Sequence, residues 1–501
     1  MNIQHLKALL LEIKKIKSIE SVLQWDQETK MPEGGGNIRA EHLAYLSSLA
    51  HHLQTGKKFT SALAKILDME SGVLLDREVN ADTRRMLYLA WRDYMDAAAL
   101  PPKFVRELSL HASKAQQVWA KCRVGDDFKT FAPVLEKMVA LKKQEADYYG
   151  YTTTPYDSLL DKYEPGMTSA KITELFEPMR QHLVKLVQAI TGSNVQIDTT
   201  PLTGFFPATG QWEFGKKVVT AMGFDWSCGR QDKSAHPFSI SFHPTDARIT
   251  TRIDEHFFNT AFFGTVHETG HALYEQGLPV ADYGNPLGDS ISYGFHESQS
   301  RLWENLIARN AHFWDHFFPI LKGYFPDPLA TVDEAQFYRM INRVKPSLVR
   351  VEADEVTYSL HIMLRFEIEK MLINENLPVN ELPEVWNQKM QDYLGIRPQN
   401  YKDGVLQDVH WSMGAFGYFP TYALGNLYAV PILEQAHKEI PGLDSLIKAG
   451  ELVPLRDWLR INIHSLGRRF DAPELIHRLT STPLSATPFI QYLETKYREI
   501  Y

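Results

Sequence analysis

The residues of this chain that most clearly could carry out chemistry are His267 and His271, two imidazoles four positions apart with Glu268 beside the first. Positions i and i+4 of an α-helix lie on the same face, so both imidazoles could bind one zinc ion. Glu268 would then lie near a water molecule at that ion and could act as a general base. This is the local chemistry of a metallopeptidase. The alternative is that both histidines are ordinary polar residues of a packed helix.

These side chains can act together only if the segment that carries them is helical, and its apolar pattern predicts that it is. Apolar or small residues recur at helical spacing on one side, and Gly277 stands where a helix would stop. We therefore expect a helix over residues 259–276. The positions that define its buried side are Phe263, Val266, Gly270 and Leu273.

A short β-hairpin is predicted just before this helix. Residues 238–242 alternate apolar and small polar side chains, residues 243–246 have the composition of a turn, and residues 248–254 would return as a second strand. An exposed edge of the hairpin could bind an extended peptide through backbone hydrogen bonds, with His236 as a substrate contact. The hairpin could equally be a cap on a helical core.

A catalytic zinc usually has three protein ligands, so a further His, Asp or Glu is needed. Glu297 is the best candidate, because it leads into a second helix in which Leu302, Leu306 and Phe313 mark a buried side. The alternative is an ordinary helix glutamate, either solvated or paired with Arg301. Judged on the residues alone, that alternative is favoured.

The rest of the chain predicts a large, mainly helical protein. With 501 residues, of which 44% are hydrophobic and 23% charged, the chain can bury a large core. Long segments of mixed apolar and charged residues have the pattern of helices at 81–99, 128–149 and 169–190. A net charge of -8 without a basic block argues against nucleic acid as a partner.

Neither a membrane nor an oxidising compartment is indicated. The longest apolar run near the N-terminus, residues 8–11, is too short for the core of a signal peptide, and no stretch has the length of a membrane span. Cys122 and Cys228 are the two cysteines, and they lie far apart without metal-ligand spacing. We therefore expect no disulfide, no membrane and a cytoplasmic location.

Five sequence motifs together resemble the M32 metallocarboxypeptidases, the carboxypeptidase Taq family. His-Glu-Ser-Gln at 296–299 follows the His-Glu-x-x-His motif, as in that family. Residues 246–250 match its D-x-R-x-T motif, and residues 404–411 match its G-x-x-Q-D-x-H-W motif. Residues 349–354 depart from its I-R-x-x-A-D motif only by valine at the first position, and residues 25–32 are also similar to the family. The resemblance runs nearly from end to end.

The resemblance implies a large helical zinc-peptidase fold, with two lobes around a deep substrate groove and a small β-hairpin or sheet near the metal. It implies one catalytic domain over residues 1–501 and a homodimer. It also implies that Glu297 is the third metal ligand, and that the activity is the release of single amino acids from the C-termini of peptides with broad specificity. Zinc is the expected ion, with cobalt as an alternative, because imidazole and carboxylate suit several divalent metals.

A carboxypeptidase needs a cation that holds the terminal carboxylate of its substrate, and arginine suits this role because its donors form a bidentate fork. Similarity to the family motif points to Arg350. Arg248 is a second candidate, although it could instead be structural and paired with Asp246.

Donors for the oxyanion of the reaction are expected close to the metal. A His followed by tyrosines flanked by glycine resembles the corresponding region of related helical zinc peptidases, and this points to His410, Tyr418 and Tyr422. The alternative is core packing, because most tyrosines near Gly and Pro only fill space.

Two other functions remain open from the sequence. The first is a zinc oligopeptidase or dipeptidyl carboxypeptidase, since related helical zinc enzymes share the metal motif. The second is a peptide-binding or scaffold protein without activity, which is disfavoured because the ligands, the base and the oxyanion donors are all retained.

Overall fold

The computed structural model describes residues 3–75 and 78–501, and most of these residues are helical. The α-helices are α1 (Ile3–Thr29), α2 (Gly36–Thr55), α3 (Lys57–Ala64), α4 (Ala81–Ala99), α5 (Pro102–Gly125), α6 (Phe128–Tyr149), α7 (Pro155–Leu160), α8 (Ser169–Thr191), α9 (Ala208–Ala221), α10 (Phe258–Gly277), α11 (Tyr293–Arg301), α12 (Ala311–Tyr324), α13 (Glu334–Ile341), α14 (Glu355–Asn374), α15 (Leu382–Leu394), α16 (Pro420–Glu439), α17 (Leu443–Lys448), α18 (Val453–Asn462), α19 (Ala472–Thr480) and α20 (Thr487–Ile500).

Shorter helical turns connect these elements. They are the 3-10 turns η1 (Glu33–Gly35), η2 (Thr200–Thr203), η3 (Val280–Asp282), η4 (Pro286–Gly288), η6 (Arg350–Glu352), η7 (Val379–Glu381) and η8 (His464–Arg469), and the π-helical segment η5 (Leu302–Ile307).

The predicted long helices are confirmed. The segments 81–99 and 128–149 coincide with α4 and α6, and α8 is one residue longer than the predicted segment 169–190. Asn80 and Asp127 cap the first two, since each side chain accepts a hydrogen bond from the backbone N–H three residues on. The helix predicted over 259–276 is α10, which extends by one residue at each end.

A three-stranded sheet lies against α10, with the order β1-β3-β2. The predicted hairpin is present as β2 (Ser239–His243) and β3 (Asp246–Thr251), which pair antiparallel with an irregularity between Ser241 and His243. Strand β3 begins at Asp246, inside the segment predicted as a turn, and ends three residues before the predicted end at residue 254. A third strand, β1 (Gly229–Lys233), pairs parallel to β3 and was not predicted. Its sequence, GRQDK, has no β-branched or aromatic residue, so the local pattern carries no strand signal.

The helix predicted to follow Glu297 differs from the observed structure. A single helix reaching Phe313 was expected, but α11 ends at Arg301, passes into the π-helical segment η5, and is followed by the separate helix α12. Asn310 ends the first stretch, because its side chain caps the N-terminus of α12. The three residues that were expected to be buried, Leu302, Leu306 and Phe313, are all buried.

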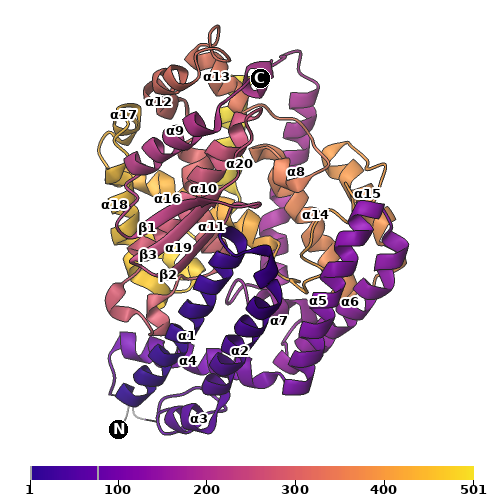
Figure 1. Ribbon diagram of the computed structural model, residues 1–501, viewed down its shortest axis with the longest axis vertical. Coiled ribbons are helices and arrows are strands. Elements are labelled where there is room, and N and C mark those ends of the chain that lie inside the picture. The colour runs from indigo at the N-terminus through magenta and orange to yellow at the C-terminus, as the bar shows by residue number, and fades with distance from the viewer. Residues whose placement is uncertain (1–2, 76–77) are drawn as a thin grey trace.

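Two apolar clusters stabilise the structure. The larger one joins the helices around α10, α11, α14 and α16, and the smaller one joins α1 to α4 with Leu287 from η4. Figure 1 shows α1 and α2, in indigo, running side by side, and α1 contacts strand β2 of the sheet. Among the described residues, none of the helices combines the length and the apolar character that crossing a bilayer requires.

Candidate metal centre and active site

Helix α10 presents His267 and His271 on one face, as the four-residue spacing predicts, and Glu268 beside them. Both histidines are half-buried, and Glu268 is buried. The helix is apolar around most of its circumference, so it lies inside the protein and not at the surface.

Two glycines allow Glu297 of α11 to approach these histidines closely. A Cβ atom on Gly270 of α10 would lie 2.6 Å from Cα of Ser300, and one on Gly425 of α16 would lie 2.6 Å from Cγ of Glu297. Both distances are too short for any residue with a side chain. Helix α11 is therefore held tightly between α10 and α16, which places its glutamate beside the imidazoles.

His267, His271 and Glu297 form the one group of possible metal ligands found within residues 3–75 and 78–501. Their ligand atoms all lie within 4.8 Å of one another. Oε2 of Glu297 is 3.7 Å from Nε2 of His267 and 3.4 Å from Nε2 of His271. Two imidazole nitrogens and one carboxylate oxygen facing a common point are a ligand set that suits a divalent transition metal and leaves a position for water. The three predicted ligands are thus brought together by the structure.

Glu297 also forms the ion pair that was the alternative interpretation from the sequence. Its other oxygen, Oε1, accepts a hydrogen bond from Nε of Arg301 at 2.7 Å. Burial alone would raise the pKa of this carboxyl, but the charges of Arg301 and His267 outweigh burial and lower the pKa. Glu297 is therefore ionised and can face both the guanidinium and a cation between the imidazoles.

The Glu268 carboxyl lies in a different electrostatic environment. Burial raises its pKa to about 7, the nearby charges of Glu297 and Glu304 act in the same direction, and His267 opposes them. A carboxyl with a pKa near 7 exchanges protons readily at neutral pH, which is what a general acid and base needs. Burial also lowers the pKa of His271 to about 3, so this imidazole is neutral and able to bind a metal.

The structure adds three residues to the site that the sequence did not single out. Glu304, on η5, lies with Oε2 2.9 Å from Nδ1 of His267. His296 lies with Nδ1 2.6 Å from Nδ1 of His271, and its Nε2 is 2.9 Å from Oε1 of Glu275. A signal for one of them was present, since Glu304 follows Glu297 by seven positions and would lie on the same face of a continuous α-helix.

Arg350 lies in η6 and is buried. Its Nε and Nη2 donate to Oδ1 of Asp408 at 3.1 and 3.0 Å, and Nη1 donates to the hydroxyl of Tyr358 at 3.2 Å. Asp408 also accepts from Nε of Arg365 at 2.7 Å. Two guanidinium groups thus share one carboxylate, which leaves one positive charge uncompensated within this cluster. The ring of Tyr358 stacks on Arg301, with 4.2 Å between the guanidinium carbon and the ring centre, which connects the cluster to the candidate ligand Glu297.

His410, Tyr418 and Tyr422 gather in one place beside this arginine. Nε2 of His410 is 3.4 Å from the hydroxyl of Tyr422, and the two tyrosine rings lie 5.1 Å apart. The guanidinium of Arg350 is 5.1 Å from the ring of Tyr422. Burial lowers the pKa of His410 to about 4, and the charges of Arg350 and Arg365 add to this effect against Asp408. Burial raises the pKa of Tyr418 to about 12, so this phenol keeps its proton and can donate it in a hydrogen bond.

Arg248 and His236 lie apart from this group. Arg248 donates to both oxygens of Asp246 at 2.9 and 3.0 Å and lies over the rings of Trp25 and Phe242, which is the structural role considered as the alternative. His236 is exposed in the connection between β1 and β2. Among the described residues, no hydrogen bond, ion pair or ring contact joins either residue to the three ligands.

A pocket of about 260 Å³ opens beside the ligands, along the edge strand β2. Ser239, Ile240 and Ser241 of that strand form one wall. His296 and Glu275 also line it. The pocket therefore extends from side chains near the candidate ligands to β2, an edge strand of the sheet.

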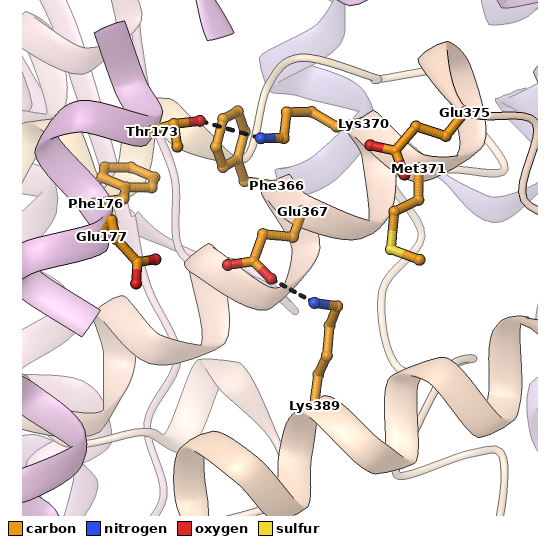
Figure 2. Close-up of a pocket in the computed structure, with 9 residues that line it drawn as sticks. All are labelled: Thr173, Phe176, Glu177, Phe366, Glu367, Lys370, Met371, Glu375 and Lys389. Carbon is orange, nitrogen blue, oxygen red and sulfur yellow. Dashed lines mark hydrogen bonds and ion pairs between the residues drawn. The ribbon is translucent and has the colours of Figure 1, made fainter. Parts of the chain in front are cut away.

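A second pocket of about 290 Å³ lies elsewhere, between α8, α14 and α15 (Figure 2). Two pairs of its polar groups contact each other: Lys370 donates to Thr173 at 3.1 Å, and Lys389 forms an ion pair with Glu367. None of its lining residues belongs to the group around α10. We place the candidate active site at the three ligands, because the one group of possible metal ligands among the described residues lies there and not at this pocket.

The chain is similar to known proteins over nearly its whole length. The family described as carboxypeptidase Taq (M32) metallopeptidase matches residues 5–497. The "Thermostable carboxypeptidase 1" of Thermus thermophilus is 42% identical over 99% of this chain and 98% of that relative. The "Carboxypeptidase 1" of Bacillus subtilis is 38% identical over 98% of this chain and 97% of that relative.

Solved structures have the same fold. The M32 carboxypeptidase from Deinococcus radiodurans has a TM-score of 0.95 and 37% sequence identity, and the alignment covers 99% of both chains. "Trypanosoma Cruzi Metallocarboxypeptidase 1" has a TM-score of 0.92 and 34% identity, again with 99% of both chains covered. The prediction of a mainly helical fold of this class, with a small sheet near the metal ligands, is confirmed.

Proposed function

Because this chain belongs to the M32 family of carboxypeptidase Taq metallopeptidases and is a metallocarboxypeptidase that acts on peptides with a divalent metal, we propose that it releases single amino acids from peptide C-termini with broad specificity. The observation that carries the proposal is the arrangement of the three ligands, His267, His271 and Glu297, near an arginine cluster with an excess positive charge. The first feature serves peptide hydrolysis, and the second serves recognition of a chain end.

We take the metal to be zinc, with cobalt as the alternative. When bound, it lowers the pKa of water to roughly 7 and polarises the scissile carbonyl. Glu268 takes a proton from the attacking water and passes it to the leaving amine, a role that its raised pKa of about 7 supports. His267, His271 and Glu297 hold the ion, with the charge of Glu297 maintained by Arg301.

Arg350 is proposed to bind the terminal carboxylate of the substrate. In the structure Arg350 already pairs with the carboxylate of Asp408, and Arg365 pairs with the same carboxylate. The single negative charge of Asp408 therefore balances only one of the two arginines. A second carboxylate, from the substrate, would therefore meet a net positive charge, and a charge-assisted hydrogen bond there would be about twice as strong as a neutral one.

His410, Tyr418 and Tyr422 are proposed to donate hydrogen bonds to the oxyanion. Their grouping next to Arg350 supports this, as does the raised pKa of Tyr418, because the phenol stays protonated at the pH at which the enzyme acts.

The free edge of β2 is proposed to hold the extended part of the peptide N-terminal to the scissile bond. The pocket along Ser239–Ser241 supports this. His236 precedes β2 and Arg248 lies on β3 opposite Ile240 of β2, and both remain candidates for contacts with the bound peptide. Pairing through backbone hydrogen bonds is independent of side chains, which suits broad specificity.

The competing function is that of a zinc oligopeptidase or dipeptidyl carboxypeptidase. Mass spectrometry of the products from one peptide with a free C-terminus and the same peptide amidated separates the two. A ladder of single-residue losses that needs the free carboxylate and stops with chelator is expected. Dipeptide steps, or equal cleavage of the amidated peptide, would contradict the proposal.

We further propose that the protein is a single catalytic domain over residues 1–501, acts as a homodimer and is located in the cytoplasm. The apolar core from α5 to α20, against which α1 packs at β2 and α4 packs at α6, supports the first point. The two free cysteines, of which Cys122 is buried, support the last, since a reducing compartment leaves thiols unpaired. Sedimentation of the purified protein tests the dimer.

A further inference from the structure

In the proposed metal site, Nδ1 of His267 and Nδ1 of His271 each contact a different side chain. Nδ1 of His267 lies 2.9 Å from Oε2 of Glu304, and Nδ1 of His271 lies 2.6 Å from Nδ1 of His296. Nε2 of His296 is in turn 2.9 Å from Oε1 of Glu275. These partners come from three different elements: Glu275 from α10, His296 from α11 and Glu304 from η5.

These contacts determine where the protons lie. A neutral histidine that offers Nε2 to a cation carries its proton on Nδ1. Nδ1 of His267 then donates to the carboxylate of Glu304. Nδ1 of His271 must also donate, so Nδ1 of His296 has to accept, and the proton of His296 lies on Nε2, where it donates to Glu275. Each ring nitrogen of the three histidines thus has one defined role.

The π-helical segment η5 contributes to this arrangement. The backbone N–H of Ala308 donates to the carbonyl of Trp303, five residues back, at 2.9 Å, which is the spacing of a π-helix. Glu304 lies within this turn, and Arg301 and Arg309 lie 3.3 and 3.5 Å from its two oxygens. Such turns are uncommon and occur often at functional sites. Here the turn carries the carboxylate that faces His267.

Glu304, the partner of His267, and the pair of His296 with Glu275, the partner of His271, have different surroundings. Glu304 is enclosed by the two arginines, whereas His296 and Glu275 line the pocket along β2. The side chain of Glu304 is 13% exposed, against 23% for His296 and 20% for Glu275. His296 and Glu275, which hold His271, are therefore the residues that a bound peptide could reach.

We propose that Glu304 and the pair of His296 with Glu275 are positioning residues, which hold His267 and His271 in the tautomer and orientation that bind the metal. This inference rests on the proposed metal site. None of the three side chains is among the ligands, so their effect should be on how tightly the metal is held and on the geometry around it. Outer partners of metal-binding histidines typically change metal affinity by about 10–100-fold.

The test compares variants that remove each partner with variants that keep an acceptor. Glu304→Leu and His296→Leu should each raise the dissociation constant for Zn²⁺ by about 10–100-fold, measured by competition with a chromogenic chelator. Glu304→Gln keeps a side-chain oxygen that can accept the hydrogen bond of His267, and His296→Asn places an amide oxygen near the position of Nδ1 of His296. Both variants should retain most of the Zn²⁺ affinity of the parent. The visible absorption spectrum of the Co²⁺-loaded protein should change in the leucine variants and return in the conservative ones.

His312→Leu is the matched control, because it removes a histidine with a carboxylate partner that belongs to α12. Nδ1 of His312 lies 3.3 Å from Oδ2 of Asp315, and the side chain is 45% exposed. Its dissociation constant for Zn²⁺ and its Co²⁺ spectrum should equal those of the parent.

Two results would overturn the inference. One is a parent-like dissociation constant and Co²⁺ spectrum in leucine variants whose circular dichroism shows that they are folded. The other is an equal loss of affinity in the leucine and conservative variants, which would indicate a general packing defect. If the parent itself binds no zinc, the proposed metal site is wrong, and this outcome is distinct from the other two.

Discussion

Oε2 of Glu297 lies 3.4 Å from Nε2 of His271, while Oε1 of the same glutamate accepts a hydrogen bond from Arg301 at 2.7 Å. One carboxylate therefore acts both as a possible metal ligand and as one half of a buried ion pair. The guanidinium keeps the glutamate ionised in a buried setting, where an isolated carboxyl would tend to take up a proton. The ion pair thus supports the ligand role and does not compete with it.

Glu268→Gln should bind the metal normally and lose turnover. Glutamine cannot accept a proton from water, and the loss of a general base typically lowers the rate by about 10²–10⁴-fold. Metal content by atomic emission and kcat on a free-carboxylate peptide are the measurements. Glu334→Gln, at an exposed position at the start of α13, should leave both unchanged. Full turnover in metal-loaded Glu268→Gln would remove the base from the proposed mechanism.

Arg350→Ala should weaken cleavage of peptides with a free carboxylate by about 10–100-fold in kcat/KM, because a charge-assisted hydrogen bond contributes about 1.5–3 kcal/mol. The slow cleavage of amidated peptides should change much less. Arg397→Ala, which removes the exposed pair with Glu384, is the control and should leave both rates unaltered. An equal loss of kcat/KM on both peptides would show that Arg350 does not bind the terminal carboxylate.

Tyr422→Phe and Tyr418→Phe should lower kcat with little change in KM, because an oxyanion forms only in the transition state. The expected loss is about 10²–10³-fold for the tyrosine that donates to it. Steady-state kinetics on one peptide measure the effect. If neither variant changes kcat, these rings serve packing only.

Gly425→Ala should disturb the metal site without replacing a ligand. The added methyl would lie 2.6 Å from Cγ of Glu297, so the glutamate or α16 must move. Overpacking of this kind costs typically about 1–3 kcal/mol, and zinc affinity should fall at least about tenfold. Gly323→Ala, in α12 with open space around the new methyl, is the control and should bind zinc as the parent does. Equal zinc affinities in the two variants would contradict this account.

Glu369 predicts a pH dependence of stability in the metal-free protein. Burial raises its pKa to about 7, although Gly417, Tyr156 and Trp411 donate hydrogen bonds that act in the opposite direction. Between its unfolded pKa of about 4.3 and about 7, the folded state keeps a proton that the unfolded state has lost. The free energy of unfolding should therefore fall with rising pH across this window, by up to about 1.4 kcal/mol per unit from this group.

Glu369→Gln cannot titrate, so its free energy of unfolding should fall less steeply between pH 4.5 and 7 than that of the parent. Urea unfolding at several pH values measures the two slopes. Parallel slopes would show that Glu369 titrates alike in both states.

Sequence patterns predicted the elements whose structure depends on residues within a single segment. Helices α4, α6 and α10 follow from caps and apolar spacing within one segment, and so does the pairing of His267 with His271. Strand β1 was not predicted, because its polar residues form a strand only through pairing with β3.

The outer partners of the metal ligands were missed for a related reason. His296 stood inside a motif that the sequence had already marked, but its contact with His271 depends on how α11 docks against α10. Arg350 was found by resemblance, and its sharing of Asp408 with Arg365 could not be predicted from spacing, since three separate segments meet there. Contacts between elements distant in the chain were the unpredictable part.

The glycines at positions 270 and 425 bear on the order of events when the enzyme is made. Because α11 fits between its neighbours only when both backbones are in close contact, the three ligands converge only after the polypeptide has packed these helices. Metal uptake would then follow folding, into a cavity whose shape is already complete. Loading such a cavity should be a single, concentration-dependent step without a slow rearrangement, and stripping the ion should leave the helices in place.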